Sequence, residues 1–215
     1  MQDFMGHEAE YRGEDVLKKR GGIHIVLCGC GSLGSRLASM FACQGYKLIT
    51  VIDDDKVERK NLSTQEYDPA DIGRKKVAQT VNRVYRKFGV RATPIDKRLT
   101  ATNVEKLLNK SDLVIDTFDN TESREIVRSV CEEMEIECVH AGMGSMGMCE
   151  VVWNSRYKVF DIEQPEDGPC EYPLATNLVV ACVALAAETV NRFVDNGVQK
   201  DLEFWLKSMK LTESA

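Results

Sequence analysis

The segment at residues 23–34 constrains the fold more than any other part of the chain. Residues 23–28 read Ile-His-Ile-Val-Leu-Cys, an apolar run that is typical of a buried strand. The run continues directly into Gly29, Gly31 and Gly34, spaced as Gly-x-Gly-x-x-Gly. Glycines at this spacing permit a tight turn between strand and helix and let a phosphate approach the backbone. The segment therefore predicts an α/β fold with a nucleotide site at its first loop.

Strand and helix patterns alternate from residue 23 to residue 141. Apolar and β-branched runs predict strands at residues 47–52, 90–95, 112–116 and 136–140. Helical spacing predicts helices at residues 75–88 and 121–134, with a shorter one that begins after Thr102 or Asn103 and ends near Asn109. Alternation of this kind predicts a Rossmann-like, doubly wound sheet of mainly parallel strands, with helices on both faces.

The pattern changes after Gly147. Residues 149–153 and 157–160 read as a hairpin around Asn154 and Ser155, which would add antiparallel strands to the C-terminal half of the sheet. The remaining segments are a proline-rich loop at residues 163–173, a long apolar helix at residues 174–194 and a closing strand within residues 202–211. Since no repeat or linker interrupts the pattern, we expect one domain over residues 1–215, with residues 1–20 as a helical N-terminal extension.

Composition limits the classes of binding partner and the cellular compartment that we expect for this protein. The formal net charge of -6 argues against nucleic-acid binding as the main function. The first 15 residues hold no apolar signal core, and the longest apolar run, residues 178–187, is too short to span a bilayer. We therefore expect a cytoplasmic protein without a membrane partner, whose eight cysteines are reduced. No Cys-x-x-Cys pair occurs, so no structural zinc site is expected.

The residues after the second predicted strand identify the nucleotide more closely. Asp53 lies 24 residues after Gly29, where an acid accepts protons from ribose hydroxyl groups. Nicotinamide and flavin enzymes share that spacing. They have no need for the polar residues that follow, which are Asp55, Asn61, Gln65, Lys76, Asp116, Asp119, Asn120 and Arg124. Amide and lysine side chains suit phosphate oxygens, and a carboxylate suits a magnesium ion. This set predicts ATP rather than a dinucleotide.

In this order, the motifs resemble those of the ThiF/MoeB/HesA family of ubiquitin-activating-like adenylyltransferases over residues 23–194. The resemblance implies a Rossmann-like mixed sheet, usually in a dimer, and an enzyme that uses ATP and Mg²⁺. Its substrate would be the C-terminal glycine of a small ubiquitin-like or sulfur-carrier protein that ends in Gly-Gly. Sulfur transfer for thiamine or a related cofactor is the commonest use among short members of the family.

The resemblance also implies roles for single residues, carried over by position. The residues at the nucleotide would be Gly29, Gly31 and Gly34 along its length, Asp53 and Asp55 at the ribose, and Asn61 and Gln65 near the phosphates. Lys76 would contact the triphosphate, Asp119 would hold Mg²⁺, and Arg124 would support that strand end. Lys76 and Asp119 are thus the expected catalytic residues.

Three positions depart from the family pattern. Thr64 stands where an arginine usually precedes the glutamine, and the candidate replacements are Arg59, Lys60, Arg74 and Lys75. The zinc cysteines are missing, since Cys170 matches the first of them but Pro173 stands at the next position, as expected of a short form without zinc. Arg12 is the best match to an N-terminal arginine that family members often lend to the neighbouring subunit.

Some residues allow a plainer interpretation. Cys170 is either a thioester or persulfide nucleophile or an unused loop cysteine, and Asp119 is either a metal ligand or the N-cap of the helix at residues 121–134. Residues 142–147 are either a platform for a carrier tail or a simple strand connection. His24 and His140, both in strands, are expected to be hydrogen-bonded structural residues.

Two other function classes stay open at this point. The first is a non-catalytic partner subunit that binds a nucleotide or a carrier, which the substitution at Thr64 favours. The second is a nicotinamide-dependent oxidoreductase, which needs only Gly29 to Asp53 and leaves residues 61–76 unexplained.

Overall fold

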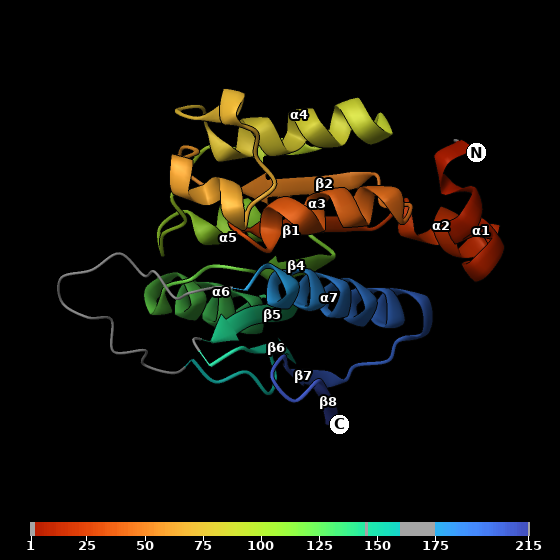
Figure 1. The fold of residues 1–215 in the computed structure, drawn as a ribbon. Helices are drawn as coiled ribbons and strands as arrows, with labels where there is room; N and C mark the ends of the chain where they lie inside the picture. The colour runs from red at the N-terminus through yellow and green to blue at the C-terminus, as the bar shows by residue number, and fades with distance from the viewer. Residues whose placement is uncertain (1–2, 145, 160–174, 215) are drawn as a thin grey trace.

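The computed structural model describes residues 3–144, 146–159 and 175–214 and contains one eight-stranded sheet (Figure 1). Its strands are β1 His24–Cys28, β2 Leu48–Ile52, β3 Thr93–Ile95, β4 Leu113–Asp116, β5 Glu137–Gly144, β6 Met148–Trp153, β7 Asp201–Trp205 and β8 Lys210–Ser214. The order in the sheet is β3-β2-β1-β4-β5-β6-β7-β8, parallel from β3 to β5 and antiparallel from β6 onward. The predicted mainly parallel sheet with antiparallel strands in its C-terminal half is confirmed.

Helices cover both faces of the sheet. They are α1 Gly6–Arg12, α2 Glu14–Arg20, α3 Gly34–Cys43, α4 Lys76–Phe88, α5 Val104–Leu108, α6 Thr121–Glu133 and α7 Thr176–Asn196, with short 3-10 turns at Asp3–Met5, Arg59–Ser63 and Pro69–Asp71. Side chains of α3, α4 and α7 pack in one core, and those of α5 and α6 in the other. The sheet is therefore the middle of three layers, as a doubly wound fold requires.

Alternation along β1 explains why the four residues after His24 are all apolar. Ile25 and Leu27 belong to the core under α3 and α7, whereas Val26 and Cys28 belong to the core under α5 and α6. A parallel strand buried on both faces has no polar positions to alternate with. The run at residues 23–28 thus fixes β1 in the centre of the sheet, between β2 and β4.

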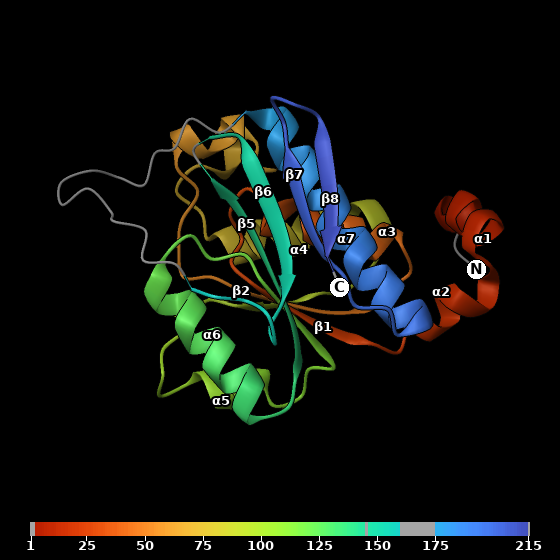
Figure 2. The same ribbon diagram turned by 90° about the horizontal axis from the view of Figure 1, so that it is seen from below.

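The structure corrects two predictions about the C-terminal strands. The hairpin partner of β6 is β5, paired from Val139↔Trp153 to Gly144↔Met148. Residues 157–159 belong to no strand, and residue 160 lies outside the described residues. Asn154 and Ser155 instead begin a helical turn, in which the Tyr157 amide donates to the Trp153 carbonyl at 3.0 Å. The predicted single closing strand is a hairpin of β7 and β8, so β6, β7 and β8 lie side by side beyond β5 (Figure 2).

Other boundaries differ less. The strand expected at residues 90–95 is confined to β3, and the helix expected at residues 174–194 is α7. The proline-rich loop predicted at residues 163–173 lies outside the described residues. Within the described ranges, α7 is the one helix long and apolar enough to cross a membrane, but 56% of its most apolar stretch is buried. Its buried residues pack in the core against the sheet, which accounts for its composition.

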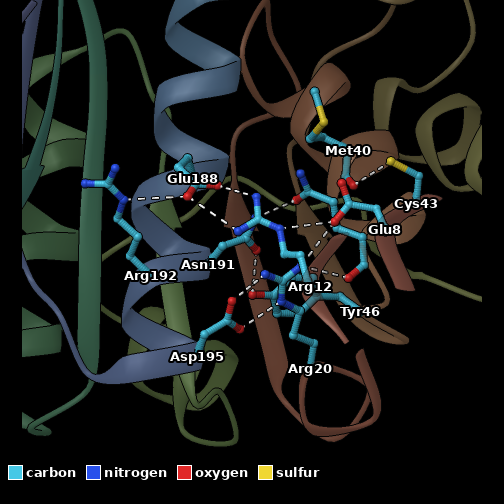
Figure 3. A network of polar contacts seen from close by, with 11 residues as sticks. Glu8, Arg12, Arg20, Met40, Cys43, Tyr46, Glu188, Asn191, Arg192 and Asp195 are labelled. Atoms are coloured by element: carbon cyan, nitrogen blue, oxygen red, sulfur yellow. Dashed lines mark hydrogen bonds and ion pairs between the residues drawn. The ribbon is translucent and has the colours of Figure 1, made fainter. Parts of the chain in front are cut away.

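The N-terminal helices are joined to α7 by a polar network (Figure 3). Arg20 is fully buried and donates to both carboxylate oxygens of Asp195, at 2.9 and 2.6 Å. Arg12 donates to Glu188 at 2.6 Å and to Glu8 at 3.3 Å. The guanidinium of Arg12 is therefore committed to acids of its own chain, which argues against the role of an arginine lent to a neighbouring subunit.

Candidate functional site

A cavity of about 530 Å³ opens at the carboxyl ends of the parallel strands. It lies beside β1 and β4, where the order of strands along the chain reverses, and this is the place where open α/β sheets bind ligands. Its volume falls in the range of small-molecule sites. Its lining includes Gly29, Gly31, Asp53, Asp55, Gln65, Lys76, Arg98, Asp119, Arg124, Gly142, Met143, Met148, Glu150 and Tyr157.

The three glycines of the first loop have different surroundings. Gly29 has a φ of +98°, and a Cβ there would meet Thr117 Oγ1 at 2.9 Å. A Cβ on Gly34 would lie 1.9 Å from the Gly29 carbonyl oxygen, whereas one on Gly31 would meet nothing within 4 Å. The structure thus places Gly29 and Gly31 in the cavity lining and Gly34 behind it, where α3 packs directly on the loop.

Asp53, at the end of β2, organises the loop. It is 8% exposed and accepts the Cys30 amide at 2.7 Å on one oxygen and the Asp55 amide at 2.8 Å on the other. Burial raises the pKa of the Asp53 carboxyl, although Lys76 and both amides oppose the shift. Each oxygen keeps a second lone pair for a donor, so the carboxylate can still accept a ribose hydroxyl.

Lys76, at the start of α4, supplies a fixed positive charge. Its Nζ lies 2.8 Å from Asp55 Oδ2, and the residue is only 7% exposed. Burial lowers the pKa of Lys76, but the carboxylates of Asp53 and Asp55 outweigh that effect and raise it above its ordinary value. The side chain therefore stays protonated beside the cavity, as phosphate binding requires.

Gln65 and Asn61, predicted as a pair, lie in different places. Gln65 lines the cavity, and its buried Oε1 accepts no hydrogen bond within the described part of the chain. Asn61 is not among the lining residues, because its Oδ1 accepts the Glu58 amide at 2.8 Å and caps a 3-10 turn. A buried acceptor without a donor is uncommon, so Gln65 fits a ligand that brings one, such as a ribose hydroxyl. A phosphate contact by Asn61 stays a prediction.

Asp119 follows β4 and lies exposed at the cavity. The N-cap of α6 is Asn120, whose Oδ1 accepts the Ser123 amide at 2.9 Å, so the interpretation of Asp119 as that cap is wrong. Across residues 3–144, 146–159 and 175–214, the Asp119 carboxylate accepts no hydrogen bond, and no group of three or more potential metal ligands occurs. Asp119 therefore fits a magnesium ion that takes its other ligands from phosphate and water.

Arg124, on α6, connects the ends of three segments. Its guanidinium donates to the Phe118 carbonyl at 2.7 Å, the Ala141 carbonyl at 2.8 Å and the Tyr157 hydroxyl at 2.9 Å. Burial opposes its charge, but Asp116 and Tyr157 raise the pKa of Arg124 above its ordinary value. Its donors are directed at protein groups, so it holds the ends of β4 and β5 in place.

Beneath Arg124 lies a buried pair that sequence reasoning missed. His140 Nδ1 lies 2.8 Å from Asp116 Oδ2, and His140 Nε2 lies 2.8 Å from Asn154 Oδ1. The imidazole stacks on Tyr157 at 3.9 Å between ring centroids. His140 is thus a hydrogen-bonded structural residue, as expected, and so is His24, which contacts the Lys110 carbonyl and the Thr50 hydroxyl. The sequence held one indication of this pair, because Asp116 lies at the end of a predicted strand.

Arg98 is a second lining residue that sequence reasoning missed. None of the four candidate replacements for the family arginine lines the cavity, whereas Arg98 does. Arg98 follows β3, and its guanidinium lies 3.8 Å from Glu122 in a largely exposed ion pair. Its place after a strand end of the predicted sheet would have indicated it.

The cysteines leave one prediction open. Cys170 lies outside the described residues, so its proposed reactivity stays a prediction. The seven cysteines in the described ranges are free thiols, and all except the half-buried Cys43 are buried. Residues 142–144 belong to β5 and line the cavity, so this part of the glycine-rich segment is both a strand end and a wall of the site.

Comparison with known proteins extends this description. The sequence matches the ThiF family over residues 7–199. It is 28% identical over 213 residues to the SAMP-activating enzyme E1 of Haloferax volcanii, covering 94% of this chain and 76% of that protein. It is 24% identical over 152 residues to the sulfur carrier protein ThiS adenylyltransferase of Escherichia coli, covering 68% of this chain and 61% of that protein.

Solved structures agree on the fold. The crystal structure of E. coli MccB with ATP has a TM-score of 0.79 at 17% identity, covering 93% of this chain and 64% of that one. MccB with MccA-N7isoASN gives a TM-score of 0.81 at 18% identity, covering 97% of this chain and 69% of that one. At such identities the likeness concerns the fold alone. The names of the sequence relatives indicate an adenylyltransferase, and the match over residues 7–199 shows that the chain belongs to the ThiF family.

Proposed function

We propose that this chain uses ATP and Mg²⁺ to adenylate the C-terminal glycine of a small ubiquitin-like or sulfur-carrier protein. The observation that carries the proposal is one cavity lined by both a fixed cation, Lys76, and an uncommitted carboxylate, Asp119. A triphosphate with its metal ion uses both charges, whereas a dinucleotide brings no metal ion for the carboxylate to hold. The named relatives that activate SAMP or ThiS support a carrier protein as the second substrate.

Each side chain then has a defined task. Lys76 would bind phosphate oxygens, Asp53 would accept a ribose hydroxyl, and the bare backbone at Gly31 would let the phosphates approach the loop. Asp119 would hold Mg²⁺, which supplies charge neutralisation on the phosphate oxygens. The carrier carboxylate attacks the α-phosphorus and pyrophosphate leaves, so the protein contributes positioning and charge rather than a nucleophile.

Three finer points belong to the same proposal. Sulfur transfer for thiamine or a related cofactor is the pathway we favour, because the ThiS adenylyltransferases of two bacteria are among the relatives. A homodimer in the cytoplasm, without zinc, is the form we expect for the enzyme. The family resemblance supports the pathway, the dimer and the lack of zinc, whereas the cytoplasmic location is inferred from the composition of the chain.

Pyrophosphate exchange into ATP, measured with candidate carriers, tests the proposal. Exchange that requires a carrier and disappears in Asp119→Ala is the expected result. ATP binding without exchange under any carrier would instead indicate a non-catalytic partner subunit. Protection of the protein by NAD and not by ATP would indicate the oxidoreductase.

A further inference from the structure

One wall of the cavity is built differently from the nucleotide-binding loop. It comes from the β5–β6 hairpin and the turn after it, and consists of Ala141, Gly142, Met143, Gly144, Met148, Glu150 and Tyr157. Apart from Glu150 and the tyrosine hydroxyl, this wall offers only apolar side chains and backbone. A Cβ on Gly144 would meet nothing within 4 Å, so an extended chain has room to approach the strand there, whereas the space beside Gly142 is filled by the Arg124 guanidinium. If the nucleotide occupies the glycine loop, this wall is where the carrier tail would lie.

Glu150 is directed to the cavity by the register of β6. Met148, Glu150 and Val152 alternate with residues that pack in the core under α7. Across the sheet, Glu150 pairs with Gly142 of β5, beside which the Arg124 guanidinium lies. On its other side it pairs with Glu203 of β7, a residue of like charge. The carboxylate is half-buried in this position.

No basic side chain in the described part of the chain forms an ion pair with Glu150, although Arg124 lies near it. The described residues include every lysine and arginine, because residues 1–2, 145, 160–174 and 215 contain neither. None of those side chains forms an ion pair or a hydrogen bond with Glu150 in the described ranges. Arg124 is near enough to act on it electrostatically, but donates to Phe118, Ala141 and Tyr157.

The surroundings of Glu150 make a negative charge on its carboxyl group unfavourable. Burial raises the pKa of the Glu150 carboxyl, Arg124 opposes that shift, and the facing Glu203 adds to it. Glu203 itself accepts a hydrogen bond from the Trp205 indole, so its carboxylate has a partner. A half-buried charge without a partner destabilises the free protein, and a ligand that brings the opposite charge removes that penalty.

Building on the proposed function, we propose that Glu150 determines carrier specificity by pairing with a positively charged side chain close to the carboxyl end of the carrier tail. The terminal glycines would extend past Gly144 toward the nucleotide. The basic residue that precedes them would lie against Glu150. A carrier with a neutral or acidic residue there would leave Glu150 unpaired and would bind less tightly.

A charge-reversal experiment tests this inference. The probes are three versions of one ubiquitin-fold carrier ending in Gly-Gly, in which the two preceding residues are both Arg, both Gln or both Glu. With the unmodified enzyme, kcat/KM for pyrophosphate exchange should be about 10- to 100-fold higher for the Arg carrier than for the Gln carrier, as expected for a charge-assisted hydrogen bond. Glu150→Gln should abolish that preference, and Glu150→Arg should reverse it toward the Glu carrier.

Glu203→Gln is the matched control, since it removes an acid from the facing position that does not line the cavity. It should leave the preference for the Arg carrier unchanged. A preference that Glu203→Gln and Glu150→Gln weaken equally would overturn the inference in favour of a general acidic field. Equal exchange with all three carriers would overturn the inference alone. ATP binding without exchange for any carrier would overturn the proposed function and the inference with it.

Discussion

The first loop offers a prediction in which two neighbouring glycines give opposite results. Gly31→Ala places a methyl group in open space, where no protein atom lies within 4 Å, and Gly31 needs no positive φ. Gly34→Ala places the same methyl group 1.9 Å from the Gly29 carbonyl oxygen and 3.0 Å from Thr117 Oγ1. The first change should therefore alter the ligand site and the second the fold.

The magnitudes follow from these distances. Overpacking of a tight contact costs about 1–3 kcal/mol, which lowers the midpoint of thermal unfolding by roughly 2–12 °C for Gly34→Ala in a chain of this size. Gly31→Ala should leave stability unchanged or raise it by about 0.4–1 kcal/mol, because alanine restricts the unfolded chain. Its methyl group occupies the space where phosphates would contact the loop. By the same overpacking cost, ATP affinity should fall by about 5- to 150-fold.

Two assays on each variant separate the effects. Thermal unfolding followed by circular dichroism reports stability, and isothermal titration with Mg-ATP reports affinity. The reasoning would be refuted by a Gly31→Ala variant that binds ATP as tightly as the unmodified protein. It would also be refuted by a Gly34→Ala variant of unchanged stability, since the loop and α3 would then be farther apart than the structure has them.

The other predictions concern caps, pH and the N-terminal network. Asn120→Ala should lower the unfolding free energy by about 1 kcal/mol through loss of the α6 cap, whereas Asp119→Ala should change it by less than about 0.5 kcal/mol, as urea titration would show. Burial opposes the charge of Asp116, but the neighbouring guanidinium and imidazole hold the pKa of Asp116 below its ordinary value. The stability that the charged Asp116 contributes is therefore present above about pH 4 and is lost as the pH falls through the folded-state pKa. Acid unfolding of Asp116→Asn should therefore depend less on pH in that range. Arg20→Ala should cost about 3–5 kcal/mol and Arg12→Ala about 0–1 kcal/mol, neither with an effect on exchange per folded molecule.

The parts of the fold that were predicted correctly are those that local sequence determines. Residues 23–34 specify β1 and its loop because burial on both faces demands apolar residues, which fill residues 25–28 without a break. Helix α4 begins and ends within one residue of the expected bounds, since its apolar face recurs at helical spacing and Gly89 adopts the left-handed conformation that stops it. Each of these signals lies within the element that it specifies.

The antiparallel strands were predicted less well because strand pairing is not a local property. Asn154 and Ser155 have the composition of a hairpin turn, yet the chain forms a helical turn there. The actual hairpin lies between β5 and β6, where Gly147 has a φ of +79°. Both segments carry turn signals, and only the partner strand decides between them. The single closing strand that was predicted is likewise a pair, because β8 continues the sheet beyond β7.

The same distinction explains the outcome at the site. Asn61 and Gln65 belong to one motif, but the turn between them places Gln65 at the cavity and assigns Asn61 to a cap. Residue type and spacing therefore located the region correctly without giving the direction of each side chain. Glu150, by contrast, belongs to no motif. Its place in the cavity depends on the antiparallel pairing of β6 with β5, which the sequence pattern did not predict. The pairing of β5 and β6 places a carboxylate in the cavity wall. We therefore expect substitutions in that wall to change which carrier is used, and substitutions in the glycine loop to change ATP binding.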